Sequence, residues 1–165
     1  MTKIKIDIYF DGACKNVKNS KTEPFGVGVA VFIDNEYSSE FSKAIYESEG
    51  TSNIAEWYGC IEALKIAEEL FLSLKSISED ENLIITIYSD SELITKQFNK
   101  EYQVRDDRLF SLFLDALRVA KRVGPEGYHK IVWIPREKNE VADELSKRGI
   151  KQNFSTELNI EDYAR

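Results

Sequence analysis

The sequence predicts an α/β fold in which helices cover both faces of a mixed five-stranded sheet. Three strand-like segments open the chain, helices and strands then alternate, and apolar residues recur with the period that each element type requires. The predicted order is three strands, a helix, a strand, two helices, a strand and a helix. A meander followed by such alternation places three antiparallel strands beside two parallel ones.

The opening strands are expected at 4–11, 25–34 and 40–47. In the first of them, Ile6, Ile8 and Phe10 alternate with more polar residues, which is the two-residue period of a strand. Turns that carry Gly, Asn and Ser separate the segments. Short turns of this kind favour an antiparallel meander.

The later elements follow from helical spacing and from breaks in the pattern. A long helix is expected from Asn53 to about Ser76, because apolar residues recur there every three or four positions: Cys60, Leu64, Ala67, Phe71 and Leu74. The remaining segments are a strand at 83–89, a helix near 91–99, a helix at about 106–123, a strand at 130–135 and a helix at 137–149. Gly149 is expected to end the last helix, since glycine is common just after a helix C-terminus.

Length and composition indicate one domain. A chain of 165 residues suits a single compact unit, which we place at residues 1–149, with 150–165 as a C-terminal tail or edge segment. Hydrophobic residues make up 42% and charged residues 31%, which is a globular and not a disordered composition. The N-terminus lacks an apolar signal core and charges interrupt every apolar run, so we expect a cytoplasmic protein without membrane contact. We also expect a monomer.

Cysteine content and net charge exclude several kinds of site. Cys14 and Cys60 are too few and too far apart for a disulfide framework or a zinc site. The formal net charge of −7 argues against a domain that holds nucleic acid by bulk electrostatics, because such domains carry a basic surface. A nucleic-acid partner would need local help, such as bound metal ions.

The first predicted strand runs directly into Asp11 and Gly12. Asp-Gly tolerates the positive φ of a tight hairpin, so turn chemistry is one interpretation of this pair. The other interpretation is that Asp11 sits at a rigid strand end in order to hold a ligand. The positions of the other carboxylates bear on this choice.

Three more carboxylates lie at similar positions, and each also has a structural interpretation. Glu56 follows Asn53 by three residues, which resembles a capping box. Asp90 follows the strand at 83–89, where an Asp makes a good cap for the next helix. Asp143 lies in the last predicted helix, where a solvated face would also explain it.

Together the four carboxylates indicate a metal site. Open α/β folds place ligand sites at the carboxyl ends of sheet strands, beside the starts of helices. Carboxylates that converge there repel one another unless a cation is bound, and Mg²⁺ binds through a few carboxylates, waters and substrate phosphates. Such a site suits phosphodiester hydrolysis, in which two ions about 3.5–4 Å apart hold the attacking and leaving oxygens.

The motifs around these carboxylates resemble those of type 1 ribonuclease H. They read DGACKN, TSNIAEWYG, YSDSELITKQ and REKNEVADELSK, in the order of that family's Asp, Glu, Asp, Asp tetrad, and the resemblance covers about residues 4–149. It implies the ribonuclease H-like fold and metal-dependent endonucleolytic cleavage of the RNA strand in RNA/DNA hybrids. The implied products carry 5′-phosphate and 3′-hydroxyl ends, and the implied cofactors are two Mg²⁺ ions, with Mn²⁺ as a substitute.

The resemblance also assigns roles to individual residues. It makes Asp11 a ligand shared by both ions, Glu56 and Asp90 the rest of one metal site, and Asp143 part of the second. Hybrid selectivity would come from groups that read the 2′-hydroxyls of RNA. The matching positions for these substrate contacts are Cys14, Asn16, Ser52, Asn53 and Glu92.

Two features depart from the family pattern. Many relatives carry a histidine that aids product release in the loop before the last Asp, whereas this loop reads WIPREKN and offers Arg136 and Glu137. The basic helical handle of some members has no counterpart here. A basic face on the helix at about 106–123 does exist, and it serves either for phosphate contacts or as a solvated face: Arg118, Lys121 and Arg122.

Two rival functions fit the sequence less well than this one. A non-catalytic nucleic-acid-binding module of the same fold would have no use for four clustered acids. Another ribonuclease H-like nuclease is disfavoured at two positions. Proofreading exonucleases place a Glu where this chain has Ala13, and transposases and integrases end their triad in Glu where this chain has Asp143.

Overall fold

A computed structural model describes residues 3–14, 25–46, 51–77 and 82–151 of the chain. The strands are β1 (Lys3–Ala13), β2 (Phe25–Ile33), β3 (Glu36–Ile45), β4 (Asn82–Ser89) and β5 (Val132–Trp133). The helices are α1 (Ser52–Ile77), α2 (Glu92–Phe98), α3 (Asp107–Ala120), the 3-10 helix η1 (Arg136–Lys138) and α4 (Glu140–Lys151). The predicted order of elements is confirmed, with η1 added.

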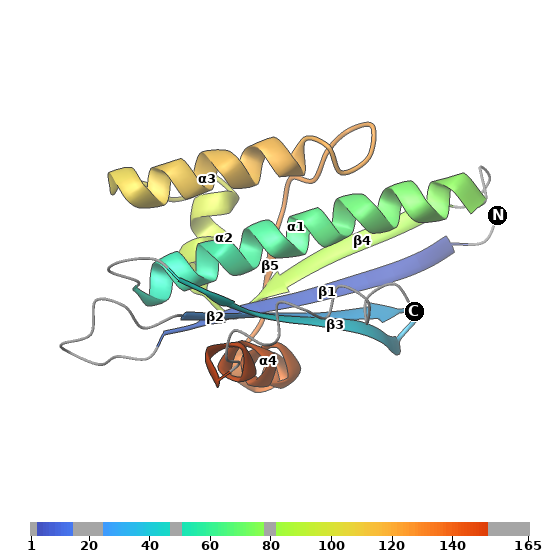
Figure 1. Ribbon diagram of the computed structural model, residues 1–165. Helices are drawn as coiled ribbons and strands as arrows, with labels where there is room; N and C mark the ends of the chain where they lie inside the picture. Colours follow the sequence, from blue (N-terminus) through green and yellow to red (C-terminus); the bar gives the residue numbers. More distant parts are fainter. Residues whose placement is uncertain (1–2, 15–24, 47–50, 78–81, 152–165) are drawn as a thin grey trace.

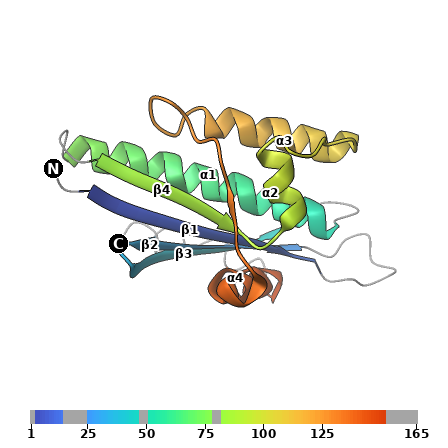
Figure 2. The same cartoon turned by 180° about the vertical axis from the view of Figure 1, so that it is seen from behind.

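A single five-stranded sheet in the order β3-β2-β1-β4-β5 organises the fold. The pairs β1–β2 and β2–β3 are antiparallel, whereas β1–β4 and β4–β5 are parallel. Helices α1 and α3 lie on one side of the sheet and α4 lies on the other (Figure 1). Seen from behind, β5 runs past the end of β4 toward α4 (Figure 2). The predicted mixed α/β sheet is confirmed, and β1 stands at its centre.

The hydrophobic core lies between the sheet and α1. The alternating residues Ile6, Ile8 and Phe10 of β1 are fully buried. Cys60 and Leu64 of α1 are fully buried as well, as the helical spacing predicts. The two-residue period of β1 and the helical period of α1 therefore identify the sides on which this strand and this helix face each other. None of the described helices is both long and apolar enough to cross a membrane.

The β2–β3 hairpin is tighter than predicted. Asp34 and Asn35 have φ values of 49° and 67°, so these two residues alone make the turn. Asp and Asn tolerate this left-handed conformation better than most residues, and it suits a two-residue hairpin. As a result β3 begins at Glu36, four residues before the predicted start at 40.

The last strand is shorter than the predicted strand at 130–135. The side-chain amide of Asn99 donates to the carbonyl of Ile131 and accepts from its N–H, both at 2.9 Å. The N–H and the carbonyl of Ile131 are therefore not available for pairing with β4. Pro135 lacks the backbone N–H that a further ladder hydrogen bond would need. The ladder is confined to Val132–Trp133.

The prediction that Gly149 ends the last helix is wrong, because α4 continues to Lys151. A Cβ at Gly149 would lie 2.6 Å from the carbonyl oxygen of Lys43 in β3. The glycine therefore serves close packing of helix on strand, which the sequence alone does not distinguish from a helix cap. The remainder of the predicted tail, 152–165, lies outside the described residues.

Candidate active site

Strand β1 passes straight through the Asp-Gly pair. Asp11 pairs with Gly28 of β2 and Gly12 pairs with Val27, so the hairpin-turn interpretation is wrong. A Cβ at Gly12 would lie 2.3 Å from the carbonyl carbon of Ala55, so glycine is needed for α1 to lie directly on the strand. Asp11 is only 5% exposed at this junction.

Glu56 faces the sheet from the second turn of α1. The hydroxyl of Thr51 accepts a hydrogen bond from the N–H of Ile54 at 3.3 Å and caps this helix. The capping-box interpretation of Glu56 is therefore wrong. Its carboxyl instead interacts with the backbone of Gly12 and with the side chain of Asp11. The close approach that glycine permits is what brings the two carboxyls together.

Asp90 follows β4 directly and thus lies beside the end of β1. The cap of α2 is Ser91, whose hydroxyl accepts from the N–H of Ile94 at 3.2 Å, so Asp90 is not the cap. The indole Nε1 of Trp133 donates to the carbonyl oxygen of Asp90 at 3.2 Å and fixes its backbone. The three side chains that meet here offer carboxylate oxygens within 4.8 Å of one another: Asp11, Glu56 and Asp90.

Helix α4 brings Asp143 to the same place from the other face of the sheet. A Cβ at Gly28 would lie 2.4 Å from the backbone N of Ser146, so α4 rests on bare strand backbone next to Asp11. Asp143 and Asp11 share a hydrogen bond, and the hydroxyl of Ser146 lies 3.4 Å from Oδ2 of Asp11. Lys147 forms an ion pair with Asp143 at 2.9 Å. The structure therefore unites all four predicted carboxylates.

The electrostatics of the cluster favour the protonated form of its central carboxyls. Burial and then the charges of Asp90 and Asp143 raise the pKa of Asp11 to about 7. Burial and then Asp11 raise the pKa of Glu56, and burial raises the pKa of Asp90. Burial acts in the same sense on Asp143, but the hydrogen bonds of Lys147 and Asp11 outweigh it and lower its pKa. Without a cation, the central carboxyls therefore resist ionisation.

Several buried oxygens at the cluster have no hydrogen-bond partner among the described residues. They are Oε2 of Glu56, Oδ2 of Asp90 and Oδ1 of Asn139. The side-chain amide of Asn139 donates a hydrogen bond to the carbonyl oxygen of Phe10 at 2.9 Å, and this bond fixes the orientation of the side chain. Unpaired buried oxygens are costly, and a hard divalent cation prefers oxygen ligands of this kind. The residues present therefore fit a divalent metal ion.

The predicted substrate contacts lie on or next to the elements that carry Asp11 and Glu56, as far as the structure describes them. Ser52 and Asn53 form the first turn of α1, with Ser52 exposed and Asn53 half-buried. Cys14 is half-buried immediately after β1. Asn16 lies outside the described residues.

Glu92 and the loop before α4 also border the site. Glu92 opens α2 and forms an ion pair with Lys96 at 2.7 Å. Arg136 and Glu137 lie in η1. The charge of Arg136 acts to lower the pKa of Asp90, which places the guanidinium electrostatically close to the cluster.

Sequence reasoning did not identify three supporting residues: Asn139, Ser146 and Lys147. All of them lie three or four positions from Asp143: Asn139 just before α4, and Ser146 and Lys147 within it. This spacing puts side chains on the same helix face. It is the feature of the sequence that could have indicated these three residues. It could not show which of them contact Asp11 or the end of β1.

Residues 9–149 match the family model described as reverse transcriptase-like. The chain belongs to this family, within the ribonuclease H-like superfamily. The sheet of the chain therefore has a ribonuclease H-like order. Its four carboxylates all lie within the matched residues.

Solved ribonuclease H structures resemble the chain over nearly its whole length. A ribonuclease H1 isolated from compost by a metagenomic approach is 30% identical, with 89% of this chain and 96% of that one covered and a TM-score of 0.70. The enzyme of Halobacterium salinarum is 26% identical, with 89% and 98% covered and a TM-score of 0.71. The N-terminal ribonuclease H domain of a Mycobacterium tuberculosis protein is 23% identical, with 90% and 94% covered and a TM-score of 0.67, and it bears on the fold alone.

Proposed function

We propose that this protein is a metal-dependent endonuclease that hydrolyses the RNA strand of RNA/DNA hybrids and leaves 5′-phosphate and 3′-hydroxyl ends. The observation that carries the proposal is the meeting of Asp11, Glu56 and Asp90 at the carboxyl ends of two adjacent parallel strands, with Asp143 beside them. The ribonuclease H1 from compost has also been solved in complex with an RNA/DNA hybrid, at 30% identity to this chain. That complex supports a hybrid substrate.

The carboxylates would hold two Mg²⁺ ions, for which Mn²⁺ is an expected substitute. Asp11 would be shared, Glu56 and Asp90 would complete one site, and Asp143 would belong to the second. When bound, such ions supply a hydroxide-like nucleophile near neutral pH and stabilise the charge of the departing 3′ oxygen. Bound cations would relieve the mutual repulsion of the central acids, which otherwise favours their protonated forms.

Other side chains of the chain would position the substrate. Ser52, Asn53 and Glu92 stand where contacts to the RNA strand are expected, together with Cys14 and Asn16 in the first loop. Trp133 holds the backbone of Asp90 through its indole N–H. Arg136 and Glu137 would line the route of product release. We further propose a cytoplasmic monomer, with 1–149 as the catalytic domain.

A cleavage assay tests the proposal directly. Labelled RNA/DNA hybrid, single-stranded RNA, duplex DNA and duplex RNA are each incubated with Mg²⁺, Mn²⁺ or EDTA. We expect cleavage of the hybrid alone, with either metal and not with EDTA. Hybrid binding without cleavage in any metal would instead identify a non-catalytic binding module.

Substitution of the ligands supplies the second half of the test. Asp11→Asn, Glu56→Gln and Asp90→Asn should each abolish cleavage while the fold persists, and Asp143→Asn should be milder because water can partly replace a second-site ligand. Glu144→Gln, an exposed neighbour on α4, is the control and should retain activity. Near wild-type cleavage by Asp11→Asn with Mg²⁺ would refute the metal assignment.

A further inference from the structure

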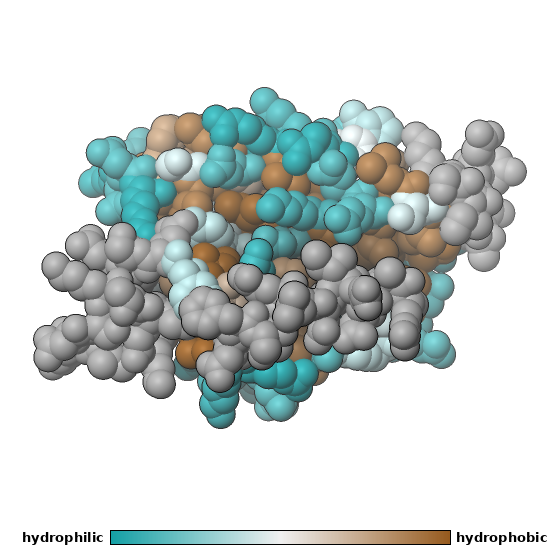
Figure 3. Space-filling model, in the orientation of Figure 1, coloured by the Kyte–Doolittle hydropathy of each residue, from teal (hydrophilic) through white to brown (hydrophobic). Residues whose placement is uncertain are grey.

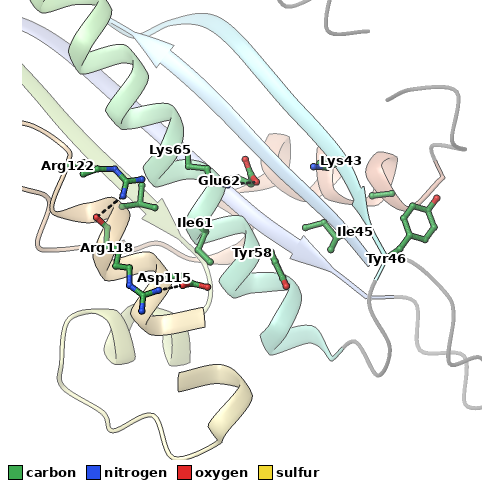
Figure 4. A pocket seen from close by; sticks show the side chains of 12 residues that line it. Lys43, Ile45, Tyr46, Tyr58, Ile61, Glu62, Lys65, Asp115, Arg118 and Arg122 are labelled. Atoms are coloured by element: carbon green, nitrogen blue, oxygen red, sulfur yellow. Dashed lines mark hydrogen bonds and ion pairs between the residues drawn. The ribbon is translucent and has the colours of Figure 1, made fainter. Parts of the chain in front are cut away.

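A second concave site lies away from the carboxylates, between α1, α3 and the end of β3 (Figure 4). This cavity, here called the α1–α3 groove, has a volume of about 660 Å³. Its size falls within the range of about 300–1,000 Å³ that is usual for ligand sites. It begins at Tyr58, two residues beyond Glu56 on the same helix, and extends along α1 to Lys65. The groove therefore starts near the active site but opens on a different face of α1.

Basic side chains from three separate elements converge on the groove. They are Lys43 of β3, Lys65 of α1, Arg118 of α3 and Arg122 just after α3. The groove lining includes two acidic side chains, Glu62 and Asp115, and Glu68 is paired with Arg122 beside it, so four cations meet three carboxylates and one positive charge is in excess, in a chain whose formal net charge is −7. Charge on this surface thus runs against that of the whole protein and favours an anionic partner.

The existing ion pairs orient these cations without saturating them. Arg118 contacts Asp115 at 2.6 Å, and Arg122 contacts Glu68 at 3.0 Å. Exposed pairs of this kind contribute only about 0–1 kcal/mol, so a phosphate can compete with the carboxylate for the same guanidinium. The carboxylates hold the arginines in place at the edge of the groove.

The floor of the groove is apolar and aromatic. Ile61 and Val119 are almost fully buried beneath it, and Tyr46 stands 43% exposed at one end. Figure 3 shows hydrophobic surface between the hydrophilic side chains of this face. A row of cations beside an exposed aromatic ring is the combination that binds single strands, because phosphates meet the cations and bases stack on the ring.

We propose that the α1–α3 groove binds an unpaired nucleic-acid strand, with phosphates on Arg118 and Arg122 and a base on Tyr46. A duplex is a poor fit because its bases are stacked inside and cannot reach an aromatic floor. The inference rests on the proposed function and extends it, since a hybrid with single-stranded ends would offer an unpaired strand to a surface outside the active site. Unpaired DNA and RNA share the chemistry, and separate arms of the test distinguish them.

Fluorescence anisotropy in EDTA measures this binding without any contribution from cleavage. The probes are labelled single strands of DNA and of RNA of about 12 nucleotides, and an abasic strand of the same length. Arg122→Glu should weaken binding at least about fivefold and lower the salt dependence by about 0.7 per lost phosphate contact. Arg148→Glu is the matched control, because Arg148 is 50% exposed against 56% for Arg122 and is also paired with a glutamate. It should change affinity less than about twofold.

A second pair of variants tests the aromatic contact. Tyr46→Ala should weaken binding of the normal strand but not of the abasic strand, whereas Tyr37→Ala should leave both unchanged. Tyr37 is 49% exposed and lies at the other end of β3, so it matches Tyr46 in exposure. Equal losses in Arg122→Glu and Arg148→Glu, or no binding by the wild type, would overturn the proposal. Loss of cleavage in the carboxylate variants bears on the active site alone, so the two proposals fail separately.

Discussion

Gly28 lies directly opposite Asp11 in the β1–β2 register, and its missing side chain lets α4 reach the carboxylates. A Cβ there would lie 2.4 Å from the backbone N of Ser146 and 2.5 Å from the carbonyl of Ala142. Both atoms belong to the backbone of α4, which cannot turn aside as the end of a side chain can. The position of Asp143 relative to Asp11 therefore depends on a glycine on the neighbouring strand.

Gly28→Ala should displace α4 and lower the free energy of unfolding by about 1–3 kcal/mol, because a well-packed contact is overfilled. Urea unfolding measures the loss, and hybrid cleavage should fall with it as Asp143 moves. Gly59→Ala is the graded control, since its Cβ would meet the ring of Phe10 at 3.0 Å and the carbonyl oxygen of Asp11 at 3.1 Å, which are milder approaches than those at Gly28, and it should cost less stability. A Gly28→Ala protein with wild-type stability and activity would contradict this account of the packing.

Removal of metal should make stability depend on pH. The pKa of Asp11 is raised to about 7 in the folded protein, from an ordinary value of 3.8, so the folded state binds more protons than the unfolded state between these values. Stability must then fall as pH rises through this window. The raised pKa values of Glu56 and Asp90 act in the same direction, whereas the lowered pKa of Asp143 acts only at more acidic pH.

Thermal unfolding from pH 5 to pH 8 checks this expectation. In EDTA the Tm should fall over this range, and saturating Mg²⁺ should remove most of the fall. Asp11→Asn should unfold at a higher temperature than the wild type at pH 8 in EDTA, because it relieves the repulsion. A wild-type Tm that rises with pH in EDTA would show that the cluster does not hold the proton.

Lys147 should compete with metal for Asp143, because its ammonium lies 2.9 Å from that carboxylate. An exposed ion pair is worth up to about 1 kcal/mol, so Lys147→Gln should lower the Mg²⁺ concentration for half-maximal cleavage by about two- to fivefold. Arg148→Gln, whose side chain pairs with Glu40 instead, is the control. An unchanged or higher metal requirement in Lys147→Gln would argue against Asp143 as a metal ligand.

Glu92→Gln should tighten hybrid binding for two reasons. The sequence indicates the first, because the charge of Glu92 repels the phosphate backbone of the hybrid. The structure adds the second. The substitution also releases Lys96 from its ion pair, and that ammonium can then face a phosphate. Binding is measured with Ca²⁺, which we expect to occupy the site without supporting turnover, at two salt concentrations. A slight loss of thermal stability should accompany the gain, because a helix start favours a negative charge by about 0.3–1 kcal/mol.

The matched control for this position is Glu144→Gln, which removes a charge and an i,i+4 contact on α4. It should leave hybrid binding unchanged. If Glu92→Gln instead weakens binding severalfold, the carboxylate itself is an RNA contact or an outer metal ligand.

Local pattern was enough to predict the elements and the four carboxylates. The alternation of Ile6, Ile8 and Phe10 and the spacing of Cys60 and Leu64 reflect burial on one face, which is a property of neighbouring residues in the chain. The placing of Asp11 and Asp90 at the ends of parallel strands followed from the order of elements, because open α/β sheets gather such ends at one edge. For these features the sequence by itself was sufficient.

Contacts between distant segments were decided only by the tertiary structure. Gly149 meets Lys43, Asn99 takes the backbone of Ile131 away from β4, and Thr51 leaves Glu56 to turn toward Asp11. From the sequence alone, each of these residues has an equally good local interpretation, as a cap, a helix end or part of a strand. Which interpretation holds depends on what packs against it, and that is set by segments up to a hundred residues away in the chain.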